Sequence, residues 1–377
     1  MQFEKYPFEK LNELLCSIQP NEDLQPLTLT IGEPQFPTPT FITKVLCEKA
    51  PLLNKYPKSA GEEELREAIL EFVKRRFAIT LKPNELVLTF GTREALFNFP
   101  QFLLAQKQEP VMAFTNPFYQ IYEGAAIAAG AKIHYLHLTK ENNFKPQIDK
   151  SLKEVDLVII NSPNNPTASV MSLDELKEWA EAALEYDFVL INDECYSEIY
   201  IDTPPASLLE AAKAIGNEEF KNILVFNSIS KRSSAPGLRS GFIAGDSAIL
   251  GEYQRYRTYV GCASPLPLQY AAAAAWRDEG HVVENRDRYR QNFVIAKEIL
   301  GVKIPEATFY IWLEVGDDLS FTKELYAKYN TKVLPGSFLG REGAGRGYVR
   351  IALVYDAQKN KEALERVANL LKEKEWI

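Results

Sequence analysis

Short apolar runs alternate with longer amphipathic segments along most of this chain. The runs are rich in Val, Ile, Leu and Phe, which is typical of strands buried on both faces. The predicted strands cover residues 85–90, 111–115, 132–137, 155–161, 188–192, 223–228 and 239–244. Alternating strands and helices favour a mostly parallel sheet with right-handed crossovers and helices on its faces. We therefore predict an α/β fold.

The helices are indicated by periodicity and by capping residues. Residues 62–77 place Leu65, Ile69, Phe72 and Val73 on one face, as an amphipathic helix does. Residues 172–186 open with Ser172-Leu173-Asp174-Glu175, the form of a capping box. One long helix is predicted over much of residues 267–300.

The pattern changes after about residue 280, and this predicts a smaller second domain. Strands are expected at 308–315 and 348–353, with helices at 321–329 and 357–372. The first 40 residues contain six prolines and are predicted to form an irregular arm that joins the small domain. The expected division is an arm at 1–40, a large domain at 41–280 and a small C-terminal α/β domain at 281–377.

Composition restricts the partners. The chain has 377 residues and a net charge of −8, which argues against nucleic acid and anionic membranes as partners. No apolar stretch approaches the ~20 residues that a membrane helix needs. The N-terminus lacks the form of a signal peptide, so a cytoplasmic location is expected. The four cysteines are scattered, and His134 and His137 have no third ligand nearby, so no metal site is predicted.

Lys231 is the residue with the most specific chemical context. It follows the apolar run at 223–228, with Ser228 three residues before it and Arg239 eight residues after it. A lysine amine forms a Schiff base with an aldehyde cofactor, of which pyridoxal 5'-phosphate is the common one. Ser228 and Arg239 would hold its phosphate. The alternative is that Lys231 is a solvent-exposed lysine on a loop. The other motifs are needed to distinguish these two interpretations.

Polar residues follow the other predicted strands, at the sheet edge where ligands of open α/β sheets bind. Gly91 opens a helix whose free N–H groups suit a phosphate, although many strand–helix turns look similar. Tyr119 could cover one face of a planar ring or simply pack in the core. Asn165, between two prolines, is suited to bond a phenolic oxygen of the cofactor.

Asp193 ends a buried strand, where a carboxylate is costly unless it is paired. A protonated pyridine nitrogen is such a partner, and that proton makes the ring an electron sink. Tyr196 lies three residues further on and could bond the same phenolic oxygen as Asn165.

These motifs resemble the fold-type I pyridoxal-phosphate aminotransferases of class I/II, from Ile31-Gly32-Glu33-Pro34 to Val349-Arg350-Ile351-Ala352. The resemblance implies a mostly parallel seven-stranded sheet between helices and a homodimer. It implies that Lys231 carries the cofactor, with Asp193 and Tyr196 as further catalytic residues. The cofactor-binding residues that it implies are Gly91, Thr92, Arg93, Tyr119, Asn165, Asp193, Tyr196, Ser228, Lys231, Arg239 and, from a partner subunit, Tyr56. It implies that Arg350, with Gly32 and Asn165, binds the substrate.

A narrower resemblance is carried by Gly91-Thr92-Arg93-Glu94-Ala95-Leu96-Phe97, by Asp193-Glu194-Cys195-Tyr196-Ser197-Glu198 and by Arg255-Tyr256-Arg257-Thr258-Tyr259. These are similar to N-succinyldiaminopimelate aminotransferases of lysine biosynthesis. The resemblance implies transamination between glutamate and N-succinyl-2-amino-6-oxopimelate. Ala168 and Ser234-Ala235 depart from the usual residues beside ligand positions. An aspartate or aromatic aminotransferase, or a pyridoxal-phosphate-dependent C–S lyase, remains the alternative.

Three other classes fit less well. Ser228-x-x-Lys231 matches a penicillin-binding serine motif, but the chain has no Lys-Thr-Gly. A Rossmann dehydrogenase needs a Gly-x-Gly-x-x-Gly turn that is absent here. A non-catalytic cofactor-binding regulator would not need every catalytic residue type. For the distal carboxylate of a substrate, the sequence offers Arg232, Arg257, Arg255 and Lys58, each of which could equally be a structural or solvated charge.

Overall fold

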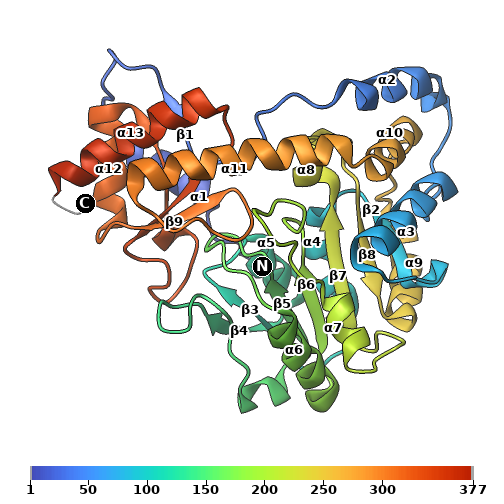
Figure 1. Cartoon of the computed structure of the whole chain (residues 1–377). Coiled ribbons are helices and arrows are strands. Elements are labelled where there is room, and N and C mark those ends of the chain that lie inside the picture. Colours follow the sequence, from blue (N-terminus) through green and yellow to red (C-terminus); the bar gives the residue numbers. More distant parts are fainter. Residues whose placement is uncertain (1, 375–377) are drawn as a thin grey trace.

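The first seven predicted strands form one seven-stranded sheet in the order β2-β8-β7-β6-β5-β3-β4, and the two later ones belong to a three-stranded sheet, β11-β12-β9. A computed structural model describes residues 2–374 (Figure 1). All neighbouring strands of this sheet run parallel except at β8, which is antiparallel to both β7 and β2. The mostly parallel α/β fold is therefore confirmed. The strands of the chain are β1 (Leu27–Thr28), β2 (Leu86–Thr89), β3 (Val111–Asn116), β4 (Lys132–His137), β5 (Leu157–Asn161), β6 (Val189–Asp193), β7 (Ile223–Ser228), β8 (Gly241–Gly245), β9 (Tyr310–Glu314), β10 (Thr331–Lys332), β11 (Leu334–Pro335) and β12 (Tyr348–Ala352).

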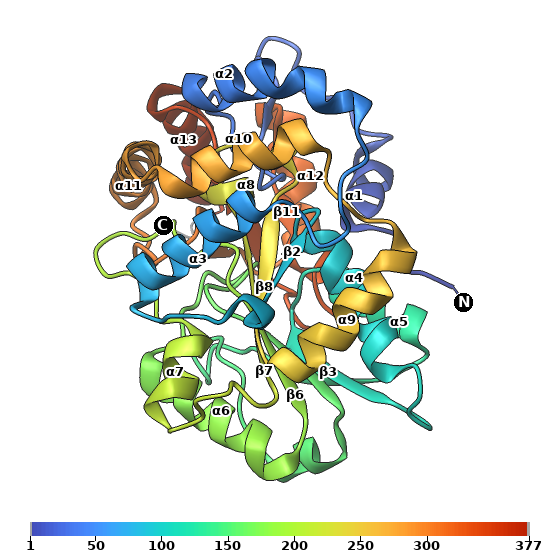
Figure 2. The same cartoon turned by 90° about the vertical axis from the view of Figure 1, so that its right-hand side faces the viewer.

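Helices cover both faces of this sheet, because alternate residues of each strand point to opposite sides. On β5, Val158 and Ile160 pack in a core with α3, α6, α7 and α10, whereas Leu157 and Ile159 pack in a core with α4, α5 and α9. Figure 2 shows α3 and α9 on either side of the sheet edge. The α-helices are α1 (Pro7–Leu15), α2 (Thr40–Lys49), α3 (Glu63–Phe77), α4 (Thr92–Leu104), α5 (Ile121–Ala129), α6 (Leu173–Tyr186), α7 (Leu208–Ala214), α8 (Ile229–Arg232), α9 (Ser247–Val260), α10 (Leu266–Arg277), α11 (Gly280–Leu300), α12 (Asp318–Tyr329) and α13 (Ala357–Glu373).

The capping box predicted for residues 172–186 is present. Ser172 Oγ accepts a hydrogen bond from the Glu175 N–H at 3.3 Å, and Glu175 Oε2 accepts one from the Ser172 N–H at 2.7 Å. Short 3-10 turns join other elements: η1 (Ala50–Asn54), η2 (Pro83–Glu85), η3 (Lys150–Glu154), η4 (Pro236–Leu238) and η5 (Gly336–Phe338).

The prediction of one continuous helix over much of 267–300 is wrong. Asp278 is extended, with φ −85° and ψ 131°, and separates α10 from α11. Arg232 donates to the carbonyls of Ala275 and Asp278 at 2.7 and 3.1 Å, which satisfies the carbonyl groups at the end of α10. Asp278 Oδ1 then accepts the N–H of His281 at 3.0 Å, in the first turn of α11.

The first 40 residues are less irregular than predicted. Pro7 opens helix α1 at the first helical position, where its missing N–H costs nothing. Strand β1 pairs in parallel with β10, and Leu27 and Leu29 pack with β9, β12, α12 and α13. The N-terminal segment thus adds to the smaller layer around the three-stranded sheet β11-β12-β9.

Helix α11 links the two sheets. Near its start, His281 Nε2 lies 2.8 Å from the Oγ of Ser233, which directly follows α8. Further along, Asn292 Nδ2 donates to the Leu353 carbonyl after β12 at 3.2 Å. Figure 1 shows the helix running from the seven-stranded sheet to the smaller layer. The exact division at residues 40 and 280 remains a prediction. In the part of the chain that the structure describes, no helix is long and apolar enough to span a bilayer.

Candidate active site

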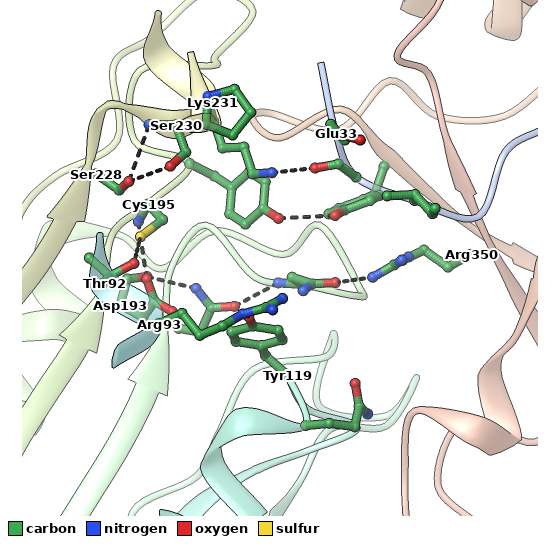
Figure 3. A pocket seen from close by; sticks show the side chains of 18 of the residues that line it. Glu33, Thr92, Arg93, Tyr119, Asp193, Cys195, Ser228, Ser230, Lys231 and Arg350 are labelled. Atoms are coloured by element: carbon green, nitrogen blue, oxygen red, sulfur yellow. Dashed lines mark hydrogen bonds between the residues drawn. The ribbon is translucent and has the colours of Figure 1, made fainter. Parts of the chain in front are cut away.

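One cavity of about 550 Å³ collects most of the residues singled out from the sequence. Strands β2, β3, β5, β6 and β7 all run in one direction, so the segments that follow them meet at one edge of the sheet. Figure 3 shows Lys231, Asp193, Arg93 and Arg350 facing the same space. The predicted residues that line the cavity are Gly32, Thr92, Arg93, Tyr119, Asn165, Asp193, Tyr196, Ser228, Lys231, Arg239 and Arg350.

Two predicted residues do not line this cavity. Gly91 has φ +70°, and a Cβ there would lie 2.2 Å from Arg239 Nη2. Its role is therefore to leave room for the Arg239 guanidinium. Tyr56 is fully exposed, so only a partner chain could bring it to an active site.

The Lys231 amine donates a hydrogen bond to the carbonyl of Gly32. Burial lowers the pKa of Lys231 to about 8. The lower pKa increases the unprotonated fraction near neutral pH, which favours a Schiff-base lysine because only the free amine attacks a carbonyl.

Asp193 lies on the floor of the cavity, 5% exposed. Its Oδ2 accepts from the Tyr122 hydroxyl at 2.8 Å, and its Oδ1 accepts from the Cys195 N–H at 3.2 Å. Burial raises the pKa of Asp193, and no salt bridge joins it to a cation among the described residues. A buried carboxylate that forms no ion pair of its own and faces the cavity suits a cationic ring nitrogen.

The phosphate end combines several donors. Thr92 is the first residue of α4 and brings the free N–H groups of a helix start. Arg239 is half-buried, and its guanidinium donates hydrogen bonds to the carbonyls of Pro236 and Phe90 at 3.0 and 3.3 Å. Ser228 caps α8 by accepting the Ser230 N–H at 3.1 Å. This set suits a phosphate dianion, so the residues fit pyridoxal 5'-phosphate at both ends.

Arg350 lies on β12 at the opposite side of the cavity and is 5% exposed. Its Nη1 donates to Asn165 Oδ1 at 2.7 Å, and its Nη2 donates to the Thr30 carbonyl at 2.6 Å. Its Nε is buried without a partner among residues 2–374. The guanidinium is thus held in place while some donors remain unused, as a carboxylate-binding arginine requires.

Two of the candidate cations for a distal carboxylate are structural. Arg232 and Arg257 are each 1% exposed. Arg232 pairs with Glu279 at 2.6 Å, and Arg257 pairs with Glu94 at 2.7 Å. Both arginines therefore have the structural role that was the alternative interpretation.

Several residues were missed: Asn161 and Tyr310 line the cavity, and Tyr122 is buried behind Asp193. Tyr122 holds Asp193, Asn161 donates to the Asp193 carbonyl at 2.6 Å, and Tyr310 lies 3.0 Å from the Tyr196 hydroxyl. Tyr122 falls three residues after Tyr119, the spacing of one helical turn, and this was an available signal. For Tyr310 the sequence offered no signal, because it sits in an ordinary strand.

Known proteins resemble this chain over nearly its whole length. The family model "Aminotransferase class I and II" matches residues 25–367. The crystal structure of the aminotransferase AspB from Helicobacter pylori 26695 has a TM-score of 0.96 and 52% identity, covering 98% of this chain and 99% of that one. An aminotransferase structure from Neisseria meningitidis Z2491 has a TM-score of 0.93 and 43% identity, with 98% of each chain covered. An LL-diaminopimelate aminotransferase from Dehalococcoides mccartyi is 32% identical over 91% of this chain and 90% of that protein.

Proposed function

This chain is a class I and II aminotransferase that uses pyridoxal 5'-phosphate, and we propose that it transfers the amino group of glutamate to N-succinyl-2-amino-6-oxopimelate. The supporting observation is a pair of guanidinium groups in one cavity, Arg350 and Arg93. Both proposed substrates carry an α-carboxylate and at least one distal carboxylate. A site with two available guanidinium groups suits such substrates better than an amino acid with a single carboxylate.

Arg93 is the proposed partner of the distal carboxylate. Its Nε donates to the Tyr119 hydroxyl at 2.7 Å, and its guanidinium lies 5.8 Å from the centre of the Tyr119 ring. None of the salt bridges between described residues involves Arg93. Its main-chain N–H at the start of α4 stays available to the phosphate, as the sequence predicted.

The other residues have defined tasks in this proposal. When bound, the cofactor supplies an aldehyde for the substrate amine and a ring that accepts electrons. Arg350 orients the α-carboxylate so that Lys231 reaches the hydrogen on Cα. Lys231 takes that proton as a base and returns it as an acid, and Asp193 keeps a proton on the ring nitrogen. Tyr119 covers the ring and excludes water.

The specificity is tested by presenting amino donors to the purified enzyme with 2-oxoglutarate. The panel contains N-succinyl-LL-diaminopimelate, LL-diaminopimelate, aspartate, phenylalanine and cystathionine. We expect ping-pong kinetics and the highest kcat/KM for the N-succinylated compound. Highest activity on aspartate or phenylalanine would refute the proposed acceptor, and release of pyruvate from cystathionine would point to a C–S lyase.

A second candidate substrate is LL-diaminopimelate without the succinyl group. It is favoured by the name of the relative from Dehalococcoides mccartyi. The two differ at the distal nitrogen, which is a neutral amide in one and an ammonium in the other. Glu33 lines the cavity and is exposed, and it would attract an ammonium. Glu33→Gln should therefore lower kcat/KM for LL-diaminopimelate if this second candidate is the substrate, and should leave it unchanged for the succinylated compound.

Arg93 is tested separately with Arg93→Met and the charge-conserving Arg93→Lys. We expect Arg93→Met to raise the KM for glutamate about tenfold or more, because a charge-assisted contact is lost. The KM for alanine, which has no distal carboxylate, should change little. Equal losses for both amino acids would contradict the assignment.

A further inference from the structure

Tyr310 lies where three parts of the active site meet. Its hydroxyl is 3.0 Å from that of Tyr196. Its ring centre is 4.4 Å from the Arg350 guanidinium. At Gly32, an added Cβ would be 1.8 Å from the Tyr310 hydroxyl, and the carbonyl of the same glycine accepts from Lys231.

This position is fixed by packing. Tyr310 is the first residue of β9 and is 2% exposed. Its ring packs against Phe309 at 4.8 Å and against Tyr196 at 5.6 Å between centroids. Strand β9 pairs with β12, so the strand that carries Arg350 also holds Tyr310. The hydroxyl therefore has little freedom to leave Tyr196.

The number of protons sets the direction of the hydrogen bond between the two phenols. Each phenol has one proton to donate. Burial raises the pKa of Tyr196 well above its usual value, so Tyr196 keeps its proton. If the Tyr196 hydroxyl donates its hydrogen bond to the phenolic oxygen of the cofactor, the hydrogen bond between the two tyrosines has to be donated by Tyr310.

We propose that Tyr310 is a positioning residue that acts in two directions. Its hydroxyl donates to Tyr196 and strengthens the hydrogen bond from Tyr196 to the cofactor oxygen, because donors in a chain polarise one another. Its ring supports the Arg350 guanidinium from one side. The hydroxyl thus affects the pKa of the Schiff base, and the ring affects how tightly Arg350 binds the substrate carboxylate. This proposal depends on the assignment of Tyr196 to the cofactor oxygen and not on the identity of the amino acceptor.

The hydroxyl is tested by the absorbance titration of the Lys231 Schiff base in the holoenzyme, which needs no substrate. A weaker donor leaves more negative charge on the cofactor oxygen, and that charge holds the imine proton more tightly. Tyr196→Phe should raise the imine pKa by about one unit, the scale of a hydrogen bond to a charged group. Tyr310→Phe should raise it by a few tenths of a unit, because the cooperative part of such a bond is roughly 10–30%.

The double variant shows whether Tyr310 acts through Tyr196. Tyr196→Phe/Tyr310→Phe should titrate like Tyr196→Phe alone, because a phenylalanine at position 196 has no hydroxyl through which an effect could reach the cofactor. The matched control is Tyr289→Phe, whose hydroxyl belongs to the same aromatic cluster and has no hydrogen-bond partner among the described residues. It should not shift the titration.

The titratable groups around Lys231 are the charged side chains of Glu33, Arg93 and Arg350 and the Cys195 thiol, whose pKa burial raises. None of them is altered by these Tyr-to-Phe changes. A shift can therefore be attributed to the phenol. An unchanged titration in Tyr310→Phe, or a shift that adds fully to that of Tyr196→Phe, would overturn the proposed role of the hydroxyl.

The ring is tested by the binding of a non-reacting dicarboxylate such as maleate, followed by its spectral change. Tyr310→Phe keeps the ring and should bind maleate as the wild type does. Tyr310→Leu removes the ring and should weaken binding about three- to tenfold, the range of one cation–π contact. Equal binding by Tyr310→Leu and Tyr310→Phe would overturn the role of the ring.

Discussion

Arg350 and Asn165 are joined by a hydrogen bond of 2.7 Å that links the three-stranded sheet to the seven-stranded one. Arg350 belongs to β12, and Asn165 lies in the loop after β5. The guanidinium that we propose to bind the substrate carboxylate is thus oriented by a residue from the cofactor side of the cavity.

Arg350→Lys should raise the KM for every amino acid about tenfold or more and leave the cofactor absorbance unchanged. An ammonium cannot hold Asn165, the Thr30 carbonyl and a carboxylate in the same plane. The measurement is the rate of the first half-reaction against amino acid concentration. Arg341→Lys, which alters an arginine paired with Glu123 outside the cavity, is the control. A normal KM in Arg350→Lys would contradict the assignment.

Lys231→Ala should abolish transamination and leave the fold intact, because among residues 2–374 the side chain makes only one hydrogen bond, to Gly32. Borohydride reduction and peptide mapping of the wild type should label Lys231, and circular dichroism should show the variant folded. The exposed Lys44 supplies the control Lys44→Ala, which should stay fully active. Appreciable turnover by Lys231→Ala would refute the Schiff-base role.

Asp193→Ala should still form the Schiff base and lose most of its rate, because the ring nitrogen would lose its anionic partner. Tyr122→Phe removes one donor to the same carboxylate, at 2.8 Å. A hydrogen bond to a charged group contributes roughly 1.5–3 kcal/mol, so turnover should fall by about 10- to 100-fold. Single-turnover kinetics measure both. Near-native turnover in Asp193→Ala would count against the electron-sink role.

Glu194 gives the folded protein a specific dependence on pH. Its Oε1 accepts from Asn192, Ser207 and the Leu208 N–H, whereas its Oε2 has no partner among the described residues. Burial raises the pKa of Glu194 to about 8. The folded state therefore keeps a proton that the unfolded state releases near its usual pKa of about 4.3.

The difference between the two pKa values of Glu194 adds to the free energy of unfolding. This contribution is fully present below pH 4 and is lost as the pH rises to about 8. The slope in that window is at most about 1.4 kcal/mol per pH unit. Glu194→Gln carries no titrating proton, so its unfolding free energy should fall less between pH 5 and 8 than that of the wild type. Thermal unfolding at several pH values measures the difference. Parallel curves would show that Glu194 is ionised in the folded protein.

Tyr56 predicts a shared active site in a homodimer. Its side chain is fully exposed, and Leu53 and Tyr259 are 71% and 92% exposed, so all three are available to a partner subunit. Light scattering should show a dimer. A hybrid dimer of a Tyr56→Ala subunit and a Lys231→Ala subunit contains one intact site if Tyr56 crosses the interface, and should regain activity. A hybrid as inactive as its parents would contradict the exchange.

Local patterns were sufficient for the main sheet. The strands predicted at 132–137 and 223–228 have those bounds in the structure. Residues 223–228 are buried along their whole length, which requires a mostly apolar run, whereas 132–137 is an edge strand in which polar and apolar residues alternate. The positions of Lys231, Asp193 and Asn165 after such strands were also enough to bring them together. Parallel strands place their carboxyl ends at one edge whatever the details of packing.

Contacts between distant residues were decided by the fold. Arg232 is a structural residue because it meets the end of α10, more than forty positions away, and the same contact ends a helix that periodicity alone would continue. Tyr310 meets Tyr196 across 114 positions, and Gly32 leaves room for its hydroxyl. A periodic pattern records which face of a strand is buried, but it holds no information about which side chain comes to lie against that face.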